Sequence, residues 1–175
     1  MKLLVVKLTS LGDVVHTFPA LTDAKAAVPD LVIDFAVDEA FAPVARLHPA
    51  VRQVIAVPQR RLAKALLRRP LATLRSAEMK AARAALAAET YDVVIDAQGL
   101  VKSALVASLA RGVRHGFARG SAREGLATAF YQHRHPVPEV EHMAVGPGPV
   151  FAAAPGDEIG RREAENGRGG APCGG

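Results

Sequence analysis

A short polar segment near the amino terminus carries residues suited to sugar or phosphate chemistry. Thr9, Ser10, Gly12 and Asp13 follow an apolar run, and a helical pattern begins directly after them. A carboxylate in a cleft can take a proton from a hydroxyl at neutral pH, hydroxyls donate hydrogen bonds to sugars or phosphates, and glycine permits close backbone approach. Asp13 is also well suited to capping the following helix, and spacing alone favours that structural role.

A second group of candidate residues is basic and follows the third apolar run. It contains Arg60, Arg61 and Lys64 and continues with Arg68 and Arg69. Such a run is most often a solvated helix face, but it also suits a site for an anionic ligand.

Polar residues follow two later parts of the chain. Asp96, Gln98 and Lys102 come after another apolar run, the type of position at which ligands bind in parallel sheets. Gln98 and Lys102 are therefore candidate ligand contacts, whereas Asp96 is expected to hold the turn through hydrogen bonds to backbone. Arg123 lies within the segment Ser121–Glu124, whose spacing fits the capping box of a helix start.

The elements that must position these residues alternate between strands and helices. Apolar runs predict strands over 2–7, 32–37, 54–57, 91–96 and 113–117. Helical patterns cover 12–28, 40–47, 74–88 and 103–110, with Pro19 expected to kink the first helix or to begin its longer second part. Strands separated by helices pair in parallel through right-handed crossovers. We therefore predict an α/β fold with a doubly wound parallel sheet.

Composition narrows the classes of partner. The chain of 175 residues, half of them hydrophobic, can bury one ordinary core. A net charge of +5 favours anionic partners, but aromatic residues make up only 5% and Trp is absent, which disfavours nucleic acid. The histidines lack metal-ligand spacing, and the single cysteine, Cys173, excludes a disulfide framework and suits a reducing cytoplasm.

No targeting or nucleotide motif is evident in the sequence. Lys7 interrupts the opening apolar run, so no signal peptide is predicted, and no apolar segment is long enough to span a bilayer. Membrane contact would therefore be peripheral. Neither GxGxxG nor a Walker GxxxxGK[ST] sequence occurs. From about Ala144 the chain is rich in Gly and Pro, so we expect residues 1–143 to form the domain and 144–175 to lack stable structure.

The ordered motifs resemble the bacterial lipopolysaccharide heptosyltransferases. The resemblance covers Lys7–Ala24, Phe41–Val57, Arg60–Arg61, Tyr91–Ser103, Ala122–Glu124 and Phe130–Tyr131. It implies the Rossmann-like amino-terminal, acceptor-binding domain of a two-domain GT-B glycosyltransferase. Such enzymes transfer heptose from ADP-L-glycero-D-manno-heptose to Kdo-lipid A in inner-core synthesis, peripherally at the cytoplasmic face of the inner membrane. The resemblance implies neither a cofactor nor a metal.

The resemblance also implies roles for individual residues. Asp13 matches the family's catalytic base in an inverting displacement, with Thr9, Ser10 and Gly12 shaping its loop. The predicted acceptor-binding residues are Thr9, Ser10, Gly12, Arg60, Arg61, Lys64, Gln98, Lys102 and Arg123. Ala63 departs from the pattern, because an arginine is common there, and a weaker affinity for the acceptor is expected.

The resemblance stops near residue 145, where the family continues toward a second, donor-binding domain. We expect that domain to be absent. We also expect residues 144–175 to come from a shifted reading frame, and this hypothesis requires that another frame of the coding DNA encodes a homologous continuation. Transfer by this chain alone is then doubtful. Two alternatives remain open: a catalytically inactive remnant that still binds the acceptor, and a general anion- or nucleotide-binding α/β module.

Overall fold

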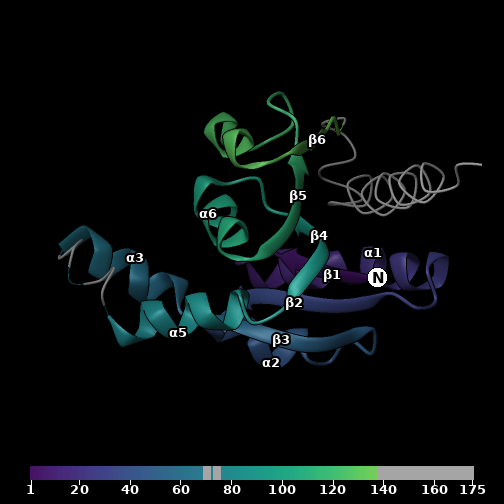
Figure 1. Ribbon diagram of the computed structural model, residues 1–175, viewed down its shortest axis with the longest axis horizontal. Helices are drawn as coiled ribbons and strands as arrows, with labels where there is room; N and C mark the ends of the chain where they lie inside the picture. Colours follow the sequence, from purple (N-terminus) through teal and green to yellow (C-terminus); the bar gives the residue numbers. More distant parts are fainter. Residues whose placement is uncertain (69–71, 73–75, 138–175) are drawn as a thin grey trace, which may run out of the picture.

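The centre of the protein is a parallel sheet of six strands in the order β3-β2-β1-β4-β5-β6. The computed structural model describes residues 1–68, 72 and 76–137. The strands are β1 (Lys2–Val6), β2 (Val32–Asp38), β3 (Val51–Val57), β4 (Thr90–Asp96), β5 (Arg111–Phe117) and β6 (His133–His135). The predicted doubly wound α/β fold is confirmed. The chain runs outward from β1 to β3 and then returns to β4 on the other side of β1, so the strand order reverses between β1 and β4 (Figure 1).

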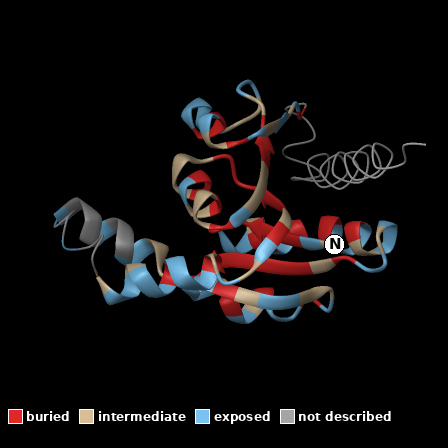
Figure 2. Cartoon of the chain, viewed as in Figure 1, coloured by how far each residue is buried: buried red, intermediate tan, exposed pale blue. Residues whose placement is uncertain are grey.

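Helices cover both faces of the sheet. They are α1 (Leu11–Ala27), η1 (Glu39–Phe41), α2 (Ala42–Ala45), α3 (Gln59–Arg68), α5 (Ala77–Leu86), α6 (Val101–Leu109) and η2 (Gly125–Phe130). Apolar residues of α1 and α2 pack on one face, and those of α5 and α6 pack on the other. Figure 2 shows the consequence: the central strands are largely buried, and exposed residues gather on the helices.

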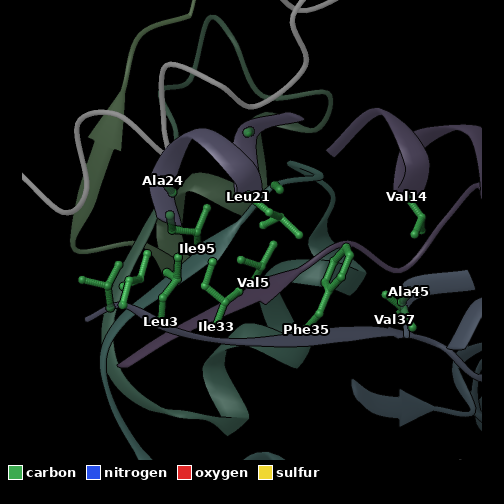
Figure 3. Packing of buried hydrophobic residues seen from close by; sticks show 14 of the residues in the cluster. Leu3, Val5, Val14, Leu21, Ala24, Ile33, Phe35, Val37, Ala45 and Ile95 are labelled. Carbon is green, nitrogen blue, oxygen red and sulfur yellow. The ribbon is translucent and has the colours of Figure 1, made fainter. Parts of the chain in front are cut away.

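The alternation of side chains along β1 divides the core into two layers. Leu3 and Val5 pack with Phe35 of β2 and Leu21 of α1 (Figure 3). The intervening residues, Leu4 and Val6, pack instead with Leu86 of α5 and Ala107 of α6. Burying each Leu or Val side chain contributes about 1.5–3 kcal/mol. Because β1 is apolar on both faces, it is fixed at the centre of the sheet.

The first helix is found where it was predicted. α1 runs from Leu11 to Ala27, and Pro19 lies inside it, while a kink at Pro19 stays a prediction. Pro19 and Val15 are both exposed, so water can satisfy the Val15 carbonyl, which loses its usual donor four residues later.

Several other boundaries also differ. The helix expected over 40–47 is a 3₁₀ turn followed by the short α2, β3 begins at Val51, and α6 begins at Val101. The basic run lies on the exposed helix α3, which agrees with its interpretation as a solvated helix face, whereas η2 and β6 were not predicted. Residues 74–75 of the expected helix 74–88, the expected domain boundary at 143 and the tail 144–175 lie outside the described residues.

The expected capping box at Ser121 is wrong. The segment from Ser121 to Glu124 forms turns, and η2 begins only at Gly125. The Ser121 hydroxyl donates to the Val137 carbonyl and accepts from the Val137 N–H. The Glu124 carboxylate accepts from Val101 N–H, at the start of α6. Both side chains therefore satisfy backbone groups far away in the sequence, and none remains to cap a local helix.

Candidate functional site

The candidate site lies where the loops after β1 and β4 meet, at the reversal of strand order that hosts ligands in parallel α/β sheets. Gln98 joins the two loops. Its Oε1 accepts from Leu8 N–H at 2.8 Å and Thr9 N–H at 3.3 Å, and its Nε2 donates to Thr9 Oγ1 at 2.9 Å. Gln98 is only 1% exposed. The structure therefore places it as the anchor of the Thr9 loop, and direct ligand contact by this residue stays a prediction.

The structure shows the capping role of Asp13 and leaves its role as a catalytic base a prediction. It lies in the first turn of α1, where its Oδ2 accepts from Ser10 N–H at 2.8 Å and from Ser10 Oγ at 3.3 Å. Its Oδ1 lies 3.8 Å from Nη2 of Arg123. One carboxylate oxygen thus stabilises the helix start, while the other faces the guanidinium of a residue from the loop after β5.

The surroundings of Asp13 keep it ionised. Partial burial would raise its pKa, but the Ser10 N–H and the positive charges of Lys7 and Arg123 outweigh that effect and hold the pKa below its usual value. The side chain is 28% exposed, so solvent still reaches it. At neutral pH Asp13 is therefore an accessible carboxylate that can accept a hydrogen bond from a hydroxyl.

Gly99 allows the Arg123 loop to approach the site. Its φ is +71°, and a Cβ at this position would lie 2.9 Å from the Phe117 ring and 3.4 Å from Arg123 N. The Gly99 carbonyl accepts from Glu124 N–H at 3.0 Å. Only glycine combines this backbone conformation with this close contact, so the loop after β4 positions Arg123 beside Asp13.

Asp96 holds the turn after β4, as predicted. Its Oδ1 accepts from the N–H groups of Gln98 and Gly99, and its Oδ2 accepts from Ser103 Oγ and from the Tyr131 hydroxyl. Burial raises the pKa of Asp96, and these donors oppose the shift without cancelling it. Asp96 is 0% exposed, so it is a structural anchor for the loop and not a ligand contact.

The predicted basic cluster lies on α3, which follows the carboxyl end of β3 (Figure 1). Arg60 lies over the ring of Phe41, 5.3 Å from its centroid. Arg61 forms ion pairs with Glu39 at 2.9 Å and with Glu78 at 3.3 Å. These pairs are exposed and therefore weak, so an anionic ligand can compete for them.

Other predicted contacts lie apart from the carboxylate. Lys64 and Arg68 are exposed on α3, and Arg69 lies outside the described residues. Within the described part of the chain, no hydrogen bond or ion pair connects α3 with Asp13 or Arg123. Lys102 is half-buried in the first turn of α6. The structure thus brings Thr9, Ser10, Asp13, Gln98 and Arg123 together and leaves the α3 cations as a separate group at the same edge.

Gly12 faces open space at the start of α1. A Cβ there would meet no atom within 4 Å, and its φ is not in the left-handed region. The fold itself therefore does not require glycine at this position.

Lys7 is a site residue that the sequence analysis missed. It directly follows β1, is 7% exposed, and donates from Nζ to the Ala97 carbonyl at 2.8 Å. The available signal was its position: a lysine immediately after a buried apolar strand, where parallel sheets place ligands. Among residues 1–68, 72 and 76–137, no group of three His, Cys, Asp or Glu side chains could hold a metal ion.

Comparison with known proteins shows what the chain is similar to. Residues 79–160 match the glycosyltransferase family 9 (heptosyltransferase) model. The resemblance seen in the sequence motifs is thereby confirmed.

Individual relatives narrow the comparison further. The chain is 48% identical over 157 residues to lipopolysaccharide heptosyltransferase 1 of Escherichia coli (strain K12), a match covering 89% of this chain and 48% of the relative. The enzyme of the same name from Salmonella typhimurium is 46% identical over 157 residues, and this match also covers 89% of this chain and 48% of the relative. The solved structure of E. coli heptosyltransferase WaaC with ADP-2-deoxy-2-fluoro heptose aligns with a TM-score of 0.81 at 46% identity, covering 89% of this chain and 49% of that one. The chain therefore spans about half the length of the curated relatives it matches.

Proposed function

We propose that this chain forms the acceptor-binding domain of a lipopolysaccharide heptosyltransferase I, with Asp13 as the general base. The observation that carries the proposal is the ionised, solvent-accessible carboxylate of Asp13 at the reversal of strand order, beside Arg123. The similarity to enzymes named lipopolysaccharide heptosyltransferase 1 supports the choice of substrates. The donor is ADP-heptose and the acceptor is Kdo-lipid A.

The proposed reaction is an inverting displacement. A hydroxyl oxygen of the acceptor attacks the anomeric carbon of the heptose, and the bond from that carbon to the phosphate oxygen of ADP breaks. ADP leaves with the bonding electrons, and the hydroxyl proton passes to Asp13. General base catalysis of this kind contributes roughly 10²–10⁴ in rate.

The acceptor is anionic, which gives the cations of the site a role. Arg123 lies beside Asp13 and would bind a carboxylate or phosphate of the acceptor through its guanidinium. Arg60, Arg61 and Lys64 on α3 would bind further anionic groups, with Lys102 at the start of α6. Thr9, Ser10 and Gly12 would line the carboxylate's loop, with Gln98 holding it in place.

A lipid-anchored acceptor requires the domain to work at a membrane surface. We propose peripheral contact with the cytoplasmic face of the inner membrane, supported by the net charge of +5 and the exposed cations of α3. In the described part of the chain, no helix is long and apolar enough to cross a membrane.

Binding of Kdo-lipid A to the full chain, measured by titration in detergent micelles against lipid A without Kdo, tests the acceptor assignment. We expect tighter binding to the Kdo-containing lipid and at least about a tenfold loss in Arg123→Ala, since a charge-assisted contact is worth about 1.5–3 kcal/mol. Arg83→Ala is the matched control, because Arg83 is an exposed cation on α5.

The alternative functions give different outcomes in the same experiment. Equal binding of both lipids, or displacement by ADP but not by the Kdo-containing acceptor, would instead indicate a general anion- or nucleotide-binding module. Acceptor binding without heptose transfer from added ADP-heptose would identify a catalytically inactive domain that still binds the acceptor.

A further inference from the structure

Thr9 and Ser10 place two consecutive hydroxyl groups in the loop after β1. A hydroxyl has one proton to donate and lone pairs that accept, so its partners within the protein decide which of these it offers to a ligand. The Ser10 hydroxyl donates to Oδ2 of Asp13 at 3.3 Å. Its proton is used within the loop, and Ser10 Oγ therefore offers lone pairs to a ligand.

Backbone donors fix the orientation of the Gln98 amide beside this loop. Its Oε1 accepts from Leu8 N–H at 2.8 Å and from Thr9 N–H at 3.3 Å. Turning the amide over would place its NH₂ group against these two N–H donors and would lose both bonds. Because Gln98 is 1% exposed, water cannot replace them. The Nε2 group of Gln98 must therefore face Thr9.

This orientation decides the polarity of the Thr9 hydroxyl. Gln98 Nε2 lies 2.9 Å from Thr9 Oγ1, and Oγ1 accepts because the amide nitrogen can only donate. Among residues 1–68, 72 and 76–137, no hydrogen bond takes up the Thr9 hydroxyl proton. Thr9 is half-buried, at the reversal of strand order. It therefore has a proton to donate to a ligand, whereas Ser10 and Asp13 offer acceptors.

We propose that Gln98 is a positioning residue that makes the Thr9 hydroxyl a dedicated donor to an anionic oxygen of the substrate. An anionic oxygen only accepts, so it suits Thr9, whereas the substrate hydroxyl that must lose its proton suits the acceptors Ser10 and Asp13. The inference rests on the proposed function, because it assumes that the loop after β1 binds substrate. Such an oxygen belongs either to the acceptor or to the diphosphate of the donor, so Kdo-lipid A and ADP are tested separately.

The first test observes the Gln98 side-chain amide by NMR in the full chain labelled with ¹⁵N and ¹³C, without any ligand. Thr9→Val keeps the shape of the side chain but removes the acceptor of Gln98 Nε2, so we expect one Nε2 proton signal to move upfield. Thr9→Ser should leave it in place, as should Thr22→Val, whose hydroxyl bonds within α1 and to His48. Unchanged Nε2 signals in a folded Thr9→Val protein would overturn the proposal.

The second test titrates Kdo-lipid A in detergent micelles and, separately, ADP. Thr9→Val should weaken the binding of one of the two ligands at least about tenfold, the usual scale for a hydrogen bond to a charged group. Thr9→Ser keeps the hydroxyl and should bind like the wild type, as should the control Thr22→Val. Unchanged affinity of Thr9→Val for both ligands would refute the contact.

A double-mutant cycle at pH 8 separates this role of Gln98 from a merely structural one. In Gln98→Glu the new carboxylate accepts, so the Thr9 hydroxyl donates to it and no longer to the ligand. Adding Thr9→Val in this background should therefore cost less than about twofold in affinity, against about tenfold in the wild type. Equal losses in the two backgrounds would overturn the role of Gln98.

The two kinds of measurement also separate this inference from the proposed function. A failure of the proposed function would appear as no binding of Kdo-lipid A by the wild-type chain. The NMR test requires no ligand and decides the orientation of the Gln98 amide in either case. If Gln98→Glu does not fold, the response of the amide signals to Thr9→Val still supports or refutes the polarity of the Thr9 hydroxyl.

Discussion

Asp13 uses its two carboxylate oxygens differently. Its Oδ2 accepts from Ser10 N–H at the helix start, and its Oδ1 lies 3.8 Å from Nη2 of Arg123. Because its pKa in the folded chain is lowered, its ionised form stabilises the fold above the unfolded-state pKa of about 3.9. That contribution disappears as the pH falls through the folded-state pKa.

Asp13→Asn should therefore lower the free energy of unfolding by roughly 0.3–1 kcal/mol at pH 7, because Asn keeps an acceptor for Ser10 N–H but removes the negative charge at the start of α1 and beside Arg123. The difference from wild type should shrink below about pH 4, where the wild-type carboxylate takes up a proton. Urea denaturation at pH 7 and at pH 3 measures both values. A difference that does not depend on pH would contradict the stated electrostatic origin.

Gly12 should be more important for binding than for stability. Ala in the first turn of α1 meets open space and has the better helix propensity, so Gly12→Ala should stabilise the chain by about 0.5–1 kcal/mol. A methyl group beside Asp13 should at the same time weaken binding of Kdo-lipid A. Thermal unfolding and lipid titration of the same variant test the pair, and unchanged affinity would exclude Gly12 from the ligand surface.

At the scale of elements, two loops depend on contacts across the sheet. Glu124, in the turn that carries Arg123, accepts from Val101 N–H at the start of α6 at 2.7 Å. Glu124→Ala should cost about 1 kcal/mol in unfolding free energy by removing this cap. It should also reduce acceptor affinity by loosening the turn beside Asp13. Glu78→Ala, which removes only an exposed ion pair with Arg61, should change stability by less than about 0.5 kcal/mol.

Tyr131 joins the end of η2 to the end of β4. Its hydroxyl donates to Asp96 Oδ2 at 2.7 Å in a buried position, and its ring occupies the space that a Cβ on Gly116 would enter. Tyr131→Phe should cost about 1–3 kcal/mol, because the buried carboxylate loses a donor. Urea denaturation tests this prediction, with Ser108→Ala as a control that removes a hydroxyl bonded only within its own helix.

The helices and strands also show how much of the fold and of the candidate site can be predicted from the sequence alone. Apolar runs rich in Val, Leu and Ile located β1, β2 and β4, because burial on both faces leaves a continuous pattern. Only the later residues of β3 and β5 were predicted, because the first residues of these strands include exposed and polar side chains. Asp13, Gln98 and Arg123 were predicted as site residues because they follow such strands or match the family's motifs, and the structure brings them together. Lys7 was missed because a lysine after a strand normally lies in solvent, and only the fold shows that Ala97 and the loop after β4 enclose it.

Long-range contacts account for the remaining errors. Ser121 and Glu124 have the spacing of a local capping box, yet their side chains bond to Val137 and Val101. Helix-capping propensities describe interactions between residues that are close in the sequence. Where two loops meet, hydrogen bonds between distant residues take the place of these local bonds. The same reason applies to η2 and β6, which lack a strong periodic pattern and depend on packing against α6 and pairing with β5.

The whole molecule carries a net charge of +5, with exposed Arg60, Arg61, Lys64 and Arg68 on one helix. We expect co-sedimentation with vesicles that contain phosphatidylglycerol and little with vesicles of phosphatidylcholine alone. Binding should fall steeply between about 50 and 500 mM salt, because exposed charges are screened over such a range. The combined variant Arg60→Ala, Lys64→Ala should lower binding, whereas Arg83→Ala should lower it less. Salt-independent binding would point to an apolar contact instead.

The strand order also has a consequence for how the protein folds during its synthesis on the ribosome. β1 is made first but stays without one of its two neighbours until Thr90–Asp96 has been synthesised, since β4 pairs along its free side. The segment of β1, β2 and β3 can assemble early, and insertion of β4 beside β1 then completes the sheet through contacts remote in sequence, which form slowly. Until that moment the nascent chain presents an unpaired apolar strand edge, which makes it a natural client of chaperones that shield such edges.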